Sequence, residues 1–184
     1  MTTPSDTFHK NRIDSARGLL FRLRLALGLF ILALVLSGLT AFPLQRELEA
    51  VISVRGLDRA APTAVHSSLD NWLLRVRDGL RDAGSRYPWM AYGTDWLAFA
   101  HLVIAVFFIG PMVNPVRNVW VLWAGLIACV MVIPLALICG PIRHIPFGWR
   151  LIDCSFGIFG AIPLWYCLIL VDRLERTPNA AEKG

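Results

Sequence analysis

The chain has 184 residues, of which 56% are hydrophobic and only 17% are charged, and its formal net charge is +5. This composition provides too little polar surface for a soluble globular domain, so we expect a small polytopic membrane protein. The excess of Lys and Arg does not indicate nucleic-acid binding. These residues flank apolar segments, as membrane anchoring predicts, and do not cluster on one exposed face.

The first membrane helix is expected at approximately residues 19–42. Arg22 and Arg24 stand at its start, where their long side chains can reach the lipid headgroups. A cleaved signal peptide is the alternative, but the apolar run is long and residues 39–41 lack the A-x-A cleavage pattern. We therefore favour an uncleaved helix that ends at Pro43.

Residues 44–94 form the only sizeable extramembrane segment, and an amphipathic helix is expected within it at approximately residues 68–83. Ser67 and Asp70 have the spacing of a capping box, which marks a helix start. Apolar residues then recur at helical spacing. They are Leu69, Trp72, Leu73, Val76 and Leu80. This helix should end near Gly84 and lie on the lipid interface or against the bundle as a lid, with partner binding as the alternative.

The second and third membrane helices are expected at approximately residues 95–111 and 119–138. The pair Gly110-Pro111 should close the second helix, which makes that span short. Only residues 114–118 connect the two helices. A connection of this length predicts that they are antiparallel neighbours.

The fourth membrane helix is expected at approximately residues 151–171, and it should pack against the third. Membrane helices associate through close backbone approach, which small side chains permit. Both helices carry such stripes at heptad-like spacing, so we expect the stripes to face each other. They are Gly125, Cys129, Val132, Ala136 and Cys139 on the third helix, and Asp153, Gly157, Gly160, Leu164 and Cys167 on the fourth.

A tight turn at the membrane surface, residues 139–154, joins the last two helices and carries most of the candidate site. The candidate ligand-binding residues lie close to the same membrane face. They are Asp95, His101, Arg143, His144, Arg150 and Asp153. In one interpretation, Arg150 pairs with Asp153, and Asp95 pairs with Arg143 or Arg150, only to neutralise helix ends. In the other, the residues form a polar pocket under the amphipathic helix for an anionic headgroup, a quinone ring or a small polar solute.

His101 is expected roughly 9 Å deeper in the membrane than Asp95, at 1.5 Å per helical residue. An ionisable group at that depth is a functional candidate. The other histidines, His9, His66 and His144, fall outside the expected spans, so a haem with two histidine ligands from this chain is not expected. The structural interpretation is a neutral histidine bonded to a backbone carbonyl or to a hydroxyl group.

No sequence motif of nucleotide-driven or standard hydrolytic chemistry is present, and no catalytic residue is assigned. The four cysteines lack C-x-x-C spacing, so we expect neither a metal site nor a disulfide framework. The sequence favours a non-enzymatic membrane component or small-ligand-binding protein. The alternatives are a redox or quinone-linked protein that uses His101 and a subunit of an oligomeric transporter. No cofactor is expected, with haem or quinone as the alternative.

The whole chain, residues 1–184, is expected to form one membrane domain, an all-α bundle of four transmembrane helices. Its partners are expected to be the lipid bilayer and further copies or a larger membrane complex, with no nucleic acid. Four spans place both termini on one side. Nine Lys and Arg lie on each side of the membrane, so their number does not decide the orientation. The basic segment before the first helix favours cytoplasmic termini in a bacterial-type plasma membrane.

Overall fold

The computed structural model describes residues 4–59 and 67–176, and for residues 4–14 the backbone alone. Within this part of the chain, four helical segments are long and apolar enough to cross a membrane. They are Ser15–Ala41, Pro88–Val113, Val119–Ile142 and Phe147–Glu175. The protein is therefore a multi-pass all-α membrane protein, as the sequence predicts.

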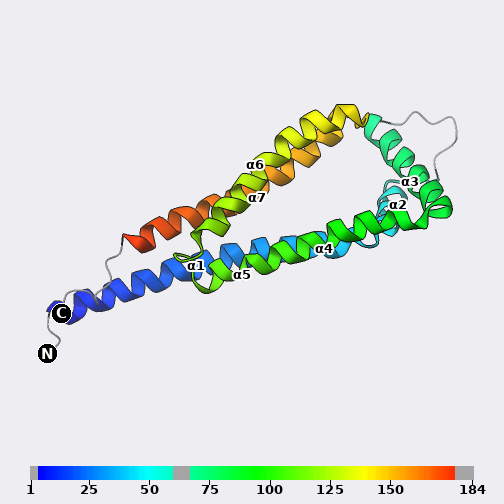
Figure 1. Cartoon of the computed structure of the whole chain (residues 1–184). Helices are drawn as coiled ribbons and strands as arrows, with labels where there is room; N and C mark the ends of the chain where they lie inside the picture. Colours follow the sequence, from blue (N-terminus) through cyan, green and yellow to red (C-terminus); the bar gives the residue numbers. More distant parts are fainter. Residues whose placement is uncertain (1–3, 60–66, 177–184) are drawn as a thin grey trace.

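The membrane helices form two pairs that diverge from one end of the molecule (Figure 1). In the first arm, α1 (Pro4–Ala41) packs against α4 (Tyr92–Phe107). In the second arm, α6 (Val119–Ile142) packs against α7 (Phe147–Glu175). The arms meet where the first half of the α1 span contacts the last turns of α7.

The buried core lies where the two arms meet. It consists of Leu23, Leu27, Phe108, Leu122, Leu164, Cys167, Leu168, Leu170 and Val171. The Cys167 thiol donates a hydrogen bond to the Leu23 carbonyl across this junction, at 3.9 Å. Farther from the core, large apolar side chains stay exposed, and Phe156 on α7 is 69% accessible. In a bilayer these side chains contact lipid, which has no cost when the surroundings are as apolar as the side chain.

The second arm confirms the expected packing of small residues. A side-chain carbon added at Gly157 of α7 would overlap the Cys129 carbonyl oxygen of α6, and one added at Gly160 would lie 3.0 Å from the Cys129 thiol. One added at Gly125 would lie 2.9 Å from Leu164. The two backbones are therefore as close as glycine allows. Cys167, assigned to the same stripe, instead turns toward α1.

The expected antiparallel packing of the second and third membrane helices is wrong, because α4 packs against α1 and α6 diverges from it (Figure 1). Gly38 of α1 allows this pairing. A side-chain carbon added there would lie 2.9 Å from the Ala98 carbonyl and 3.1 Å from His101 Cβ. Ala98 and Ala105, which lie seven residues apart on α4, are both buried. Small residues thus set the spacing in both arms.

The second span is longer than expected and does not end at Gly110-Pro111. A 3-10 turn, η1 (Pro88–Ala91), precedes α4, and a short helix, α5 (Ile109–Val113), extends it to 26 residues in total. Pro111 has no amide proton to donate to the Phe107 carbonyl four residues earlier, but the chain stays helical across this position. At the end of the segment the Gly110 carbonyl accepts two hydrogen bonds, from the Asn114 backbone amide at 2.9 Å and from the Asn118 side-chain amide at 3.1 Å.

The turn between α6 and α7 is much shorter than the expected residues 139–154, because α6 continues through Pro141 to Ile142 and α7 begins at Phe147. The end of α6 is closed by two backbone bonds, from the His144 amide to Pro141 at 3.0 Å and from the Ile145 amide to Gly140 at 2.9 Å. This is a Schellman motif. It places His144 in the left-handed region, with φ of 56°.

The extramembrane segment contains two helices where one was expected. Here α2 (Leu44–Val54) follows α1 directly, and α3 (Ser68–Arg86) begins with the expected capping box. The Asp70 amide donates to the Ser67 hydroxyl at 3.1 Å, and that hydroxyl donates to the Asp70 carboxylate at 2.7 Å. Gly84 does not end α3, which stays helical up to Arg86 and stops at Tyr87, the residue before Pro88.

The helices α2 and α3 form an antiparallel pair, which we call the roof hairpin, across the open ends of the arms (Figure 1). Arg55 pairs with Asp70 at 2.7 Å at one end, and Arg81 pairs with Glu49 at 3.0 Å toward the other. The Ser67 hydroxyl and the Arg55 guanidinium lower the pKa of Asp70 below its ordinary value of 3.8.

The apolar faces of the roof hairpin point toward each other and toward the start of α7. They enclose a space of about 390 Å³ whose walls include Trp72 of α3 and Trp149 of α7. Leu69 of α3 also packs beside Gly148 of α7. The expected amphipathic lid therefore lies against the bundle and links the second arm to the first.

Candidate functional site

The structure separates the six candidate residues into three places. Asp95 lies in the first turn of α4, at the end of α3, whereas Arg143, His144, Arg150 and Asp153 lie around the α6–α7 turn, near the beginning of α3 (Figure 1). His101 lies farther along the α1–α4 interface. Within the described residues, Asp95 forms no ion pair with Arg143 or Arg150.

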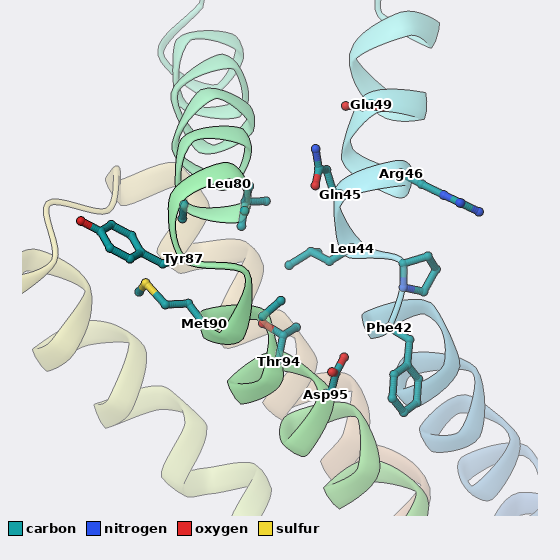
Figure 2. Close-up of a pocket in the computed structure, with 14 residues that line it drawn as sticks. Phe42, Leu44, Gln45, Arg46, Glu49, Leu80, Tyr87, Met90, Thr94 and Asp95 are labelled. Atoms are coloured by element: carbon teal, nitrogen blue, oxygen red, sulfur yellow. The ribbon is translucent and has the colours of Figure 1, made fainter.

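A cavity of about 840 Å³ lies between the α1–α2 junction, the end of α3 and the start of α4 (Figure 2). We call it the roof cavity. Its apolar walls come from Phe42, Leu44, Leu80 and Met90. Its polar lining comes from Gln45, Arg46, Glu49, Thr94 and Asp95. The cavity combines apolar and polar surface at the boundary of the membrane-spanning helices.

Asp95 is the unpaired acid of the roof cavity. Glu49 is neutralised by Arg81 at 3.0 Å, but Asp95 has neither an ion pair nor a hydrogen-bond partner among the residues that the structure describes. Figure 2 shows Leu44 and Asp95 directed into the space between α2 and α4, while the Arg46 side chain extends away from them. The position of Asp95 in the first turn of α4 suits a carboxylate, because the helix dipole is positive there.

His101 forms the hydrogen bond to a backbone carbonyl that was expected if the residue has a structural role. Its Nδ1 atom lies 2.8 Å from the Leu97 carbonyl oxygen, one turn earlier on α4, so the tautomer protonated at Nδ1 donates to that oxygen. Its Cβ atom faces Gly38 of α1. In the described part of the chain, no three His, Cys, Asp or Glu side chains are grouped closely enough to hold a metal ion.

Arg150 has an unusual environment at the α6–α7 turn. Its Cγ and Cδ atoms rest on Gly140 of α6, and its guanidinium carbon lies 5.1 Å from the centre of the Phe147 ring. The Nε atom is buried and has no acceptor. Arg150 does not form the ion pair with Asp153 that one interpretation of the sequence invoked, since neither residue has an ion-pair partner within residues 15–59 and 67–176.

Sequence reasoning missed the α2 side of the roof cavity, to which Gln45 and Glu49 belong. The signal was present, since Leu44, Leu48 and Val51 recur at helical spacing. Alternating basic and acidic residues between them made the segment resemble a solvated loop. The chain matches no protein-family model, no curated protein and no solved structure.

Proposed function

We propose that the protein is a non-enzymatic membrane component that binds a small amphiphilic molecule in the roof cavity. Small-molecule sites typically occupy about 300–1,000 Å³ and combine apolar walls with a few polar groups. The roof cavity, at about 840 Å³, has this size and lining. The observation that carries the proposal is the unpaired carboxylate of Asp95 beside the apolar side chains Phe42 and Leu44.

The chemistry of the lining favours one class of ligand over the others considered from the sequence. An anionic headgroup would face the carboxylate of Asp95, and repulsion between like charges opposes that arrangement. A quinone offers only carbonyl acceptors, so it would leave the Asp95 carboxylate without a hydrogen-bond donor even if Gln45 or Thr94 donated to its carbonyl groups. An alkylammonium ion satisfies both parts of the cavity, because its head pairs with Asp95 and its chain lies against the apolar walls.

Titration of the purified protein with decylammonium in a neutral detergent tests this proposal. Asp95→Asn keeps the shape of the side chain but removes its charge. Because a hydrogen bond to a charged group contributes about 1.5–3 kcal/mol, affinity should fall roughly tenfold or more. Asp153→Asn is the matched control, since it removes the same charge from the other arm and should leave affinity unchanged. Equal affinity of Asp95→Asn and the native protein, or equal binding of decyl sulfate, would refute the proposal.

We also propose that the roof hairpin faces the outside of a bacterial-type plasma membrane, with both termini in the cytoplasm. The basic segment before the first span supports this orientation, because such residues are retained on the cytoplasmic side. The experiment is labelling of intact cells with an impermeant maleimide, in a background without the native cysteines. Ser67→Cys should react and Ser5→Cys should not, and the opposite pattern would invert the assignment.

A further inference from the structure

The α6–α7 turn carries three basic side chains that the roof cavity does not use. Arg143 and His144 are exposed at the tip of the turn, and Arg150 lies one turn into α7. None of the three has an ion-pair partner among the described residues. An arginine stays charged in proteins, so both guanidinium groups require a compensating anion or water.

The position of Arg150 is fixed by its neighbours. Because residue 140 is glycine, the aliphatic part of the Arg150 side chain packs directly against the α6 backbone. The Phe147 ring lies beside the guanidinium. Because its Nε atom is buried without an acceptor, Arg150 has lost part of its hydration. A planar guanidinium held in this way is prepared for a two-oxygen acceptor such as a phosphate.

The depth of Arg150 lets its long side chain reach the lipid phosphates. The 29 residues of α7 extend about 43 Å at 1.5 Å per residue, whereas the hydrocarbon core is about 30 Å thick. A centred helix then extends roughly 6 Å beyond the hydrocarbon at each end. Arg150, three residues after Phe147, therefore lies at the boundary between the hydrocarbon and the headgroups.

We propose that Arg150 and Arg143 bind the phosphate of an anionic phospholipid at the α6–α7 turn. The exposed ring of Phe147 is placed to contact the glycerol region and the start of the acyl chains, which a free phosphate ion lacks. Asp153 lies one turn deeper on a neighbouring face of α7 and is partly buried without an ion-pair partner in the described chain. Its negative charge favours a headgroup with one negative charge over a headgroup with several.

Lipid binding to purified protein, measured by native mass spectrometry, tests this site. The lipids are phosphatidylglycerol and phosphatidylcholine with identical acyl chains, and the native protein should bind phosphatidylglycerol roughly tenfold more tightly. Arg150→Gln should abolish this preference. Gly140→Ala should also weaken it, because the added methyl group displaces the Arg150 stem while the charge remains. Arg117→Gln, at the opposite membrane face, should keep it.

Three results would overturn the proposal. Equal binding of the two lipids to the native protein would show that no anionic lipid is selected. A full preference in Gly140→Ala, or its loss in Arg117→Gln, would show a general charge effect and no built site. Displacement of the lipid by inorganic phosphate would assign the site to a free ion. The outcome is independent of Asp95 and of the roof cavity.

Discussion

Replacement of Gly157 by alanine should separate α6 from α7. The added methyl group would overlap the Cys129 carbonyl oxygen, which is part of a helix backbone and cannot rotate aside. Restoring van der Waals contact requires the helices to move apart by roughly 1 Å. Gly160 is a matched control on the same helix, because its added methyl group meets the Cys129 thiol at 3.0 Å, and a side chain can adjust.

The cost follows from dispersion across the interface. A gap of about 0.5–1 Å forfeits roughly a quarter to a half of the ~0.1–0.2 kcal/mol that each atom pair contributes. Over about 40 pairs, the number that one buried leucine makes, the loss is about 2 kcal/mol. Gly160→Ala should cost less than ~1 kcal/mol, because the thiol can move away from the added methyl group.

Thermal unfolding in a mild detergent, followed by circular dichroism, measures the difference between the two variants. Gly79→Ala serves as a second control, because Gly79 lies in α3 with no atom near its added methyl group. This change should stabilise α3 slightly, by up to ~1 kcal/mol. Equal melting of Gly157→Ala and Gly160→Ala would refute the argument that backbone contact, not the loss of glycine itself, determines the cost.

Two further predictions concern the roof hairpin and the α6–α7 turn. The lowered pKa of Asp70 means that its carboxylate stabilises the hairpin above the ordinary value of 3.8, and this stabilisation is lost as the pH falls through the lower folded value. The protection factors of the α3 amides, which correct for the slower intrinsic exchange at low pH, should therefore fall as the pH is lowered below about 3.8 in the native protein, and much less in Asp70→Asn; equal pH dependence of the two would contradict this role. His144→Gly should raise unfolding stability by about 1 kcal/mol, because only glycine adopts the left-handed conformation at the end of α6 without strain. A melting temperature no higher than that of His144→Ala would show that the conformation is not strained.

The sequence predicted the elements that have strong local signals. Long apolar runs identify four spans, because the hydrocarbon thickness sets their length, and Ser67 with Asp70 marks the start of α3. The sequence also predicted the contact of Gly157 with α6. Small residues are the means by which membrane helices approach each other, so the expected interface follows from their spacing alone.

What the sequence did not predict depends on which helices pair. A short connection brings two helix ends together but does not make the helices pack along their length. Because α4 packs closely against α1 at Gly38, α6 diverges from α4. The candidate site was divided for the same reason. Asp95 belongs to the first arm and Arg150 to the second, and the roof hairpin keeps them apart.

The pairing of α1 with α4 also sets an order for assembly during synthesis. About fifty residues separate the end of α1 at Ala41 from the start of α4 at Tyr92, which corresponds to roughly 3–10 s of translation at about 5–20 residues per second. During that interval Gly38 has no partner helix, because α4 has not yet been made. The second arm has no such delay, because only the four residues 143–146 separate α6 from α7. The second arm can therefore form as a helical hairpin as soon as both helices are made, while α1 depends on its late partner.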